Sequence, residues 1–147
     1  MLRSHLRRLP GLIGVAALTL TTAFLLLRWG HIPASVPIHW GASGQADAWG
    51  TRGSLLFPLL LGWLLYGGLS LIARLPGVWN GPGTTERALA SIRTMLEVLR
   101  ALLALSFSWM TLCAAWGRDL GVWFLPVFLL SIFGAILWGA VRALRAR

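Results

Sequence analysis

Long runs of hydrophobic residues without a charge alternate with short polar segments along the chain. Each run is rich in Leu, Ala, Val and Phe, and about 20 such residues cross a bilayer as an α-helix. The pattern therefore predicts an all-α integral membrane protein with four transmembrane helices. The four uncharged runs cover residues 9–27, 53–73, 101–117 and 120–141.

The polar segments between the runs predict how the elements follow one another. Thr84 or Thr85 can cap the third helix, with Glu86 near its positive end. In the second helix, small residues at Gly62, Gly67, Gly68 and Ser70 offer flat surface for close helix packing. We expect a single membrane domain over residues 1–147. Its elements are helix one at about 9–28, an outer cap at 29–53, helix two at about 54–73, an inner loop at 74–84, helix three at about 85–116 and helix four at about 120–142.

A fifth uncharged stretch, residues 29–46, does not have the pattern of a membrane helix. It contains Pro33, Pro37, Gly41 and Gly44, and a lipid-facing helix cannot leave its backbone groups unpaired at so many breaks. Gly41, Ser43 and Gly44 permit a tight reversal. The stretch is therefore predicted to be an ordered extracytoplasmic loop, re-entrant or interfacial, that caps the outer mouth of the helix bundle.

The charged residues predict the orientation in the membrane. The chain has 13 arginines and no lysine, and its net charge is +9. If the amino terminus is inside, ten arginines lie on that side and three on the other, so both termini are expected to be cytoplasmic. These arginines flank hydrophobic helices rather than forming a soluble basic domain. The charge therefore indicates contact with the lipid bilayer and not with nucleic acid.

A second polar group is expected at the cytoplasmic edge of helix three. Arg93, Glu97 and Arg100 have the spacing i, i+4 and i+7, which places them on one helix face. Ionisable residues near a membrane span are functional candidates. At the edge of the span, however, ion-paired and snorkelling side chains are common, and we favour this structural interpretation.

Three interpretations of the outer cap remain open. The reversal can bring His39 toward Asp47, whose carboxylate would hold the imidazole in one tautomer; this pair either only holds the loop or also supports binding. A metal-binding membrane enzyme would use His31, His39 and Asp47 as ligands, although their spacing matches no strong zinc pattern. Hydrolysis would need Ser35 or Ser43 beside His39, but neither has a recognised nucleophile context. We expect a non-enzymatic protein without a cofactor or a metal.

The segment IPASVPIHW, residues 32–40, followed by Gly44 and Asp47, resembles a motif of bacterial membrane proteins. The motif is (L/I)-P-x-x-(I/V)-P-x-H-(aromatic)-x-x-x-G-x-x-D. It is typical of the domain of unknown function 1648, the amino-terminal module of Sdp-type toxin-immunity membrane proteins. Helices one and two fit the family's arrangement, whereas helices three and four match it only in hydropathy. One departure is Gly41, where the family often has Asn.

The resemblance implies a multi-pass protein of the bacterial cytoplasmic (inner) membrane that acts as a binding or resistance module. Its outer cap would contact a peptide toxin, a lipid or a membrane protein partner. A homodimer is compatible with the sequence, because four short helices with Gly-rich faces bury little surface on their own. The residues that the resemblance assigns to the binding or structural cap are Pro33, Pro37, His39, Trp40, Gly44 and Asp47.

Overall fold

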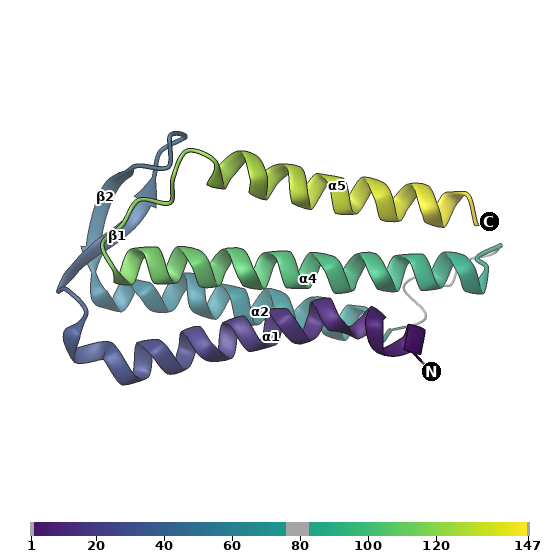
Figure 1. Cartoon of the computed structure of the whole chain (residues 1–147), viewed down its shortest axis with the longest axis horizontal. Helices are drawn as coiled ribbons and strands as arrows, with labels where there is room; N and C mark the ends of the chain where they lie inside the picture. The colour runs from purple at the N-terminus through teal and green to yellow at the C-terminus, as the bar shows by residue number, and fades with distance from the viewer. Residues whose placement is uncertain (1, 76–82, 147) are drawn as a thin grey trace.

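Four long helices run side by side in the computed structural model, which describes residues 2–75 and 83–146 and the side chains from residue 9 onward (Figure 1). Within these residues, each of the four is long and apolar enough to cross a membrane, α2 together with the 3-10 turn before it. This finding supports a multi-pass membrane protein, as the hydrophobic runs predict. The helices are α1 (Leu2–Arg28), α2 (Leu56–Ile72), α4 (Glu86–Ala115) and α5 (Phe124–Leu144).

Helix α4 lies at the centre of the bundle, and α1, α2 and α5 each pack along it (Figure 1). Within α4, 44% of the apolar span is buried inside the protein, whereas the corresponding fraction in α5 is 6%. Helix α5 approaches α4 closely at Gly139, where a Cβ atom would lie 2.6 Å from the Cβ of Met95. Most of the apolar surface of α5 is therefore left for contact with lipid.

Three of the predicted helix starts differ from the structure, and one of them is that of α5, which begins at Phe124 rather than near residue 120. Helix α1 begins at Leu2 rather than near residue 9, and α2 begins at Leu56 after a 3-10 turn at Arg52–Leu55. The predicted cap of the third helix is confirmed at Thr85, whose Oγ1 accepts a hydrogen bond from the N–H of Ala88 at 3.2 Å. Most of the predicted inner loop, residues 76–82, lies outside the described residues.

The glycines of α2 pack only in part as predicted. Gly62 is buried, and a Cβ atom there would lie 2.9 Å from Leu18 and 3.0 Å from Phe107, so it allows α1 and α4 to approach α2. The prediction is wrong for Gly67 and Gly68, because a Cβ atom at either position would meet nothing within 4 Å. These two glycines lie on a face of α2 that no other described part of the chain covers.

The segment predicted as an outer cap contains a two-stranded antiparallel β-hairpin of β1 (Ser35–Trp40) and β2 (Ala46–Thr51). The fold is mostly helical as predicted, and this small sheet is what the all-α expectation did not include. The two prolines favour extended backbone, and the β-branched Val36 and Ile38 fit a strand. Val36 is fully buried and belongs to the same apolar core as residues of α1 and α2. In Figure 1 the hairpin lies across one end of the bundle, here named the hairpin end; both termini lie at the opposite end, the terminal end.

A polar cluster connects three helices toward the terminal end. The Tyr66 hydroxyl donates a hydrogen bond to the carbonyl of Gly11 at 2.7 Å. Arg100 Nη1 donates to Ser70 Oγ at 2.7 Å, and Arg100 Nη2 pairs with Glu97. The guanidinium also lies 5.0 Å from the centre of the Tyr66 ring. This Arg100 cluster, made of Gly11, Tyr66, Ser70, Glu97 and Arg100, supports the structural interpretation of the charges on the third helix.

Candidate functional site

The hairpin has an irregular register in the middle of both strands. Pro37 pairs with Trp49 and His39 pairs with Ala48, so Ile38 is an extra residue in β1. The next pair joins Trp40 to Ala46, which makes Asp47 an extra residue in β2. Bulges of this kind bend a strand and redirect its side chains. In β1, Val36 and Pro37 are both buried and Ile38 and His39 are both exposed, whereas partly buried and exposed residues still alternate along β2.

The predicted pairing of His39 with Asp47 is confirmed. The Nδ1 atom of His39 lies 2.5 Å from Oδ1 of Asp47. Because an ionised carboxylate only accepts hydrogen bonds, His39 must carry a proton on Nδ1 in this contact. The two side chains are 68% and 51% exposed, and exposed ion pairs contribute only about 0–1 kcal/mol to stability. The pair therefore orients the imidazole more than it stabilises the hairpin.

The structure does not bring His31 into a metal-binding group with His39 and Asp47. His31 ends the 3-10 turn η1 (Trp29–His31) before the hairpin, and its side chain is exposed. Across the described ranges, no three His, Cys, Asp or Glu side chains are close enough to hold one metal ion. The convergence of three ligands that a metal-dependent mechanism requires is thus not found.

The turn of the hairpin is the tight reversal that the sequence predicts. The N–H of Gly44 donates to the carbonyl of Gly41 at 2.8 Å, and the N–H of Gly41 donates to the carbonyl of Gln45 at 2.9 Å. Gly44 has a φ of +76°, and a Cβ atom there would lie 2.3 Å from the carbonyl oxygen of Gly121. Two features therefore require glycine at position 44. The backbone has a positive φ there, and a Cβ atom would have no space beside Gly121.

Three hydrogen bonds fasten the tip of the hairpin to the connection between α4 and α5. They link residues that lie more than 70 positions apart in the chain. One bond joins two backbone groups, and another has the carboxylate of Asp119 as its acceptor. We name this set the clasp. Its bonds are Trp40 Nε1 to the carbonyl of Arg118 at 3.2 Å, the N–H of Ala46 to Asp119 Oδ1 at 2.9 Å, and the N–H of Leu120 to the carbonyl of Gly44 at 2.9 Å.

The contribution of residues 118–120 was missed by reasoning from the sequence, which treated them only as a short connection. The signal available in the sequence was Asp119, an acidic residue in the short segment between Gly117 and Gly121. At the other end of the hairpin, the N–H of Arg52 donates to the carbonyl of Ala34 at 3.0 Å and its Nη1 donates to the carbonyl of Trp29 at 2.9 Å. The hairpin is thus held at both its base and its tip.

Two apolar pockets open on either side of β1. The larger has a volume of about 350 Å³ and lies between β1, α2 and α4, with Phe57, Pro58 and Phe107 in its walls. The smaller has a volume of about 280 Å³ and lies between the hairpin turn, α4 and the start of α5. Both are lined by Ile38, Trp40 and Met110.

The six predicted cap residues are distributed unevenly around these pockets. Pro37 is fully buried and lines the larger pocket, whereas Pro33 is exposed before β1. His39 and Gly44 line the smaller pocket, and Trp40 lines both. Asp47 lines neither pocket and contacts His39. The motif therefore forms the wall between two apolar pockets and fixes the turn beside them.

Comparison with protein families gives one match for this region. Residues 16–62 match the family described as Domain of unknown function (DUF1648). The matched segment runs from within α1 through the hairpin into α2, and it contains the whole motif. The resemblance to the domain of unknown function 1648 is confirmed for this part of the chain, whereas the likeness to Sdp-type toxin-immunity proteins stays a prediction. Comparisons with curated proteins and with solved structures gave no significant match.

Proposed function

We propose that this protein is a non-enzymatic binding module of the bacterial inner membrane, similar to the amino-terminal module of Sdp-type toxin-immunity proteins. The ligand would be an apolar or amphipathic peptide that reaches the hairpin from the extracytoplasmic side. The observation that carries the proposal is the pair of apolar pockets flanking Ile38 and Trp40 in the segment that matches the DUF1648 family.

The distribution of charge supports this orientation. Arg28, Arg52 and Arg118 belong to segments at the hairpin end, and the other nine arginines within the described residues belong to segments toward the terminal end. Basic residues are retained on the cytoplasmic side of bacterial membranes. The hairpin and its pockets would then face the outer interface, where a secreted peptide arrives.

The pockets suit apolar side chains better than a polar substrate. Their walls are mainly aliphatic and aromatic, and Ile38 between them is 49% exposed. Burying such surface against a ligand yields about 25 cal/mol per Å² of apolar area. The His39–Asp47 pair lies beside the smaller pocket, where the exposed imidazole can hydrogen-bond to the backbone of a bound peptide.

A protection assay with a pocket-filling substitution tests the proposal. Met110 lines both pockets, so Met110→Trp would fill space in each of them. Wild-type protein expressed in a sensitive bacterium is expected to raise survival in the presence of an Sdp-type peptide toxin, and Met110→Trp to abolish the gain. The matched control is Leu130→Trp, which adds the same ring at a site on α5 that is 74% exposed.

Equal amounts of the three proteins in the membrane, measured by immunoblotting, make the survival values comparable. If the wild-type protein gives no protection, the peptide-binding function is wrong. If Leu130→Trp loses protection to the same extent as Met110→Trp, the pockets are not the site. A reporter fused to each terminus checks the orientation, and an extracytoplasmic signal from either terminus would contradict it.

A further inference from the structure

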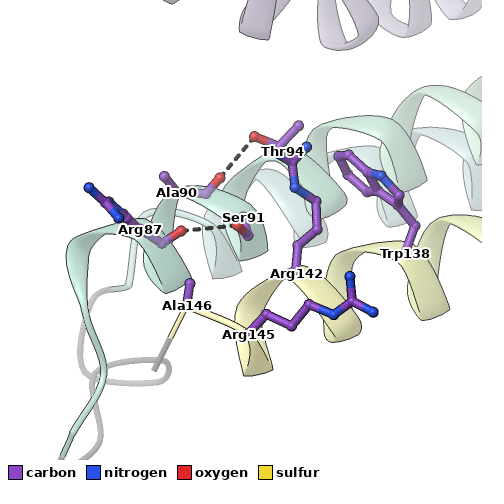
Figure 2. Close-up of a pocket in the computed structure, with 8 residues that line it drawn as sticks. All are labelled: Arg87, Ala90, Ser91, Thr94, Trp138, Arg142, Arg145 and Ala146. Atoms are coloured by element: carbon purple, nitrogen blue, oxygen red, sulfur yellow. Dashed lines mark hydrogen bonds between the residues drawn. The ribbon is translucent and has the colours of Figure 1, made fainter.

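A pocket with a different character lies at the terminal end, between the beginning of α4 and the end of α5 (Figure 2). Its volume is about 510 Å³. The hydroxyl of Thr85 donates a hydrogen bond to the carbonyl of Ala146, which holds the two helix ends together beside it. The polar and aromatic residues in its wall are Arg87, Ser91, Thr94, Trp138, Arg142 and Arg145.

The pocket is lined by three arginines and by no acidic residue. The whole sequence has four acidic side chains, and two of them are already paired, Asp47 with His39 and Glu97 with Arg100. Glu86 precedes Arg87 in the chain but does not line the pocket. In the described part of the chain, none of the three arginines forms an ion pair. Among the described residues, the pocket is therefore a concentration of positive charge with no acidic side chain in its wall.

The donors that face the pocket are guanidinium groups. The hydroxyls of Ser91 and Thr94 already donate to the carbonyls of Arg87 at 3.0 Å and Ala90 at 2.8 Å, as the dashed lines in Figure 2 show. Arg142 reaches from α5 toward α4, and its Cζ lies 5.0 Å from the centre of the Trp138 ring. A planar guanidinium held in this way can give two parallel hydrogen bonds to a phosphate group.

We infer that this pocket binds the phosphate of an anionic phospholipid, with Arg142 and Arg145 as the first contacts. In Figure 2, Arg87 points away from these two, so it contributes charge at the rim rather than a direct bond. Basic pockets between membrane helices are a recognised form of headgroup site. The inference is independent of what the hairpin pockets bind and of the orientation in the membrane.

A lipid fits the surroundings of the pocket better than free phosphate does. Trp138 forms part of its wall, and the neighbouring surface of α5 presents Leu137 at 66% and Leu144 at 63% exposure. Acyl chains attached to a bound phosphate can lie against this apolar surface, where they remove it from contact with water or other lipids. Free phosphate would gain only the polar contacts.

Lipid titration of the full-length protein in a neutral detergent tests the inference. Native mass spectrometry would measure the bound fraction with phosphatidylglycerol, with phosphatidylcholine of the same acyl chains, and with inorganic phosphate. We expect phosphatidylglycerol to bind most tightly. Arg142→Gln and Arg145→Gln should each weaken it by about tenfold, because each removes hydrogen bonds between charged partners.

The matched control is Arg28→Gln, which removes the same charge from an exposed arginine at the hairpin end and is expected to leave phosphatidylglycerol binding unchanged. Equal losses from Arg28→Gln and the pocket variants would overturn the inference, since the attraction would then be to net charge alone. Inorganic phosphate binding as tightly as phosphatidylglycerol would overturn the assignment to a lipid, as would equal binding of phosphatidylcholine. If Arg142→Gln misfolds because the contact of Arg142 with the Trp138 ring is lost, Arg145→Gln still tests the inference, since Arg145 is not stacked on that ring.

Discussion

The two ends of the bundle are closed in different ways. At the hairpin end, the clasp consists of hydrogen bonds in which backbone groups take part, and the pockets beside it are apolar. Toward the terminal end, the helices are joined by the side chains of the Arg100 cluster, and the pocket between α4 and α5 is lined by arginines. The closure at the hairpin end therefore depends on shape and backbone conformation, whereas the closure toward the terminal end depends on charged side chains.

This difference predicts which substitutions each end tolerates. Closure through side chains should fail when a charged partner is removed, because the remaining partner stays buried without compensation. Closure through the backbone should instead fail when the conformation of a glycine is blocked. Four substitutions in the full-length protein test the comparison, and each can be measured as a change in the free energy of unfolding in mixed micelles.

The largest effect is expected from Arg100→Met. The Arg100 side chain is 15% exposed, and its loss leaves Glu97 at 20% exposure without its cation and Ser70 without a donor. Breaking a buried pair from one side costs about 3 kcal/mol. Arg93→Met is the matched control, because Arg93 is exposed on the same helix. Equal losses of stability in the two variants would show that the Arg100 cluster does not join the helices.

Gly44→Ala is expected to lower stability by about 2 kcal/mol, since alanine at positive φ is strained and its Cβ would meet the carbonyl of Gly121. Gly30→Ala serves as the control, because a Cβ atom at Gly30 meets nothing within 4 Å. Amide hydrogen exchange at Leu120, which donates to Gly44, should become faster in Gly44→Ala alone. Unchanged exchange there would contradict the role of the turn in the clasp.

Asp119→Ala removes the acceptor of the Ala46 N–H and is expected to cost about 1 kcal/mol, the usual net value of one hydrogen bond. Asp119→Asn keeps an acceptor oxygen at the same place and should recover most of this loss. If both variants are equally destabilised, the charge of Asp119 matters rather than its bond to the hairpin.

The smallest effect is expected from His39→Ala. The pair with Asp47 is exposed, so its loss should cost less than about 1 kcal/mol and leave the hairpin in place. Nuclear magnetic resonance of labelled Ala46 and Ala48 would report the backbone on both sides of the pair. A loss of stability larger than that of Asp119→Ala would mean that the side-chain pair, and not the clasp, holds the hairpin.

The sequence predicted those features that depend on local pattern. Uninterrupted hydrophobic runs located the four helices, Thr85 had the chemistry of a helix cap, and the glycines at positions 41 and 44 marked the turn. The contact between His39 and Asp47 followed from that turn, because the reversal brings together residues eight positions apart.

The strands and the clasp could not be predicted in the same way. With a bulge at Ile38, β1 lacks the regular alternation that identifies a half-buried strand. Burial does alternate along β2, but its half-buried positions hold the small residues Ala46, Ala48 and Gly50 while Trp49 is exposed, so no hydrophobic pattern marks it. The clasp joins residues 73 and 78 positions apart, and no local pattern reports such a contact. The open face at Gly67 and Gly68 was also missed, because glycine permits close packing but does not require it.

The clasp also bears on how the protein is made. The hairpin lies in the segment that matches the DUF1648 family, but its partners at residues 118–120 come later in the chain and are synthesised only after α4. During translation the tip of the hairpin therefore stays unfastened until α4 and the residues directly after it have been synthesised and have reached the hairpin. The segment that matches the family model does not contain these partners, so the tip of its hairpin is fastened by residues from the later part of the chain.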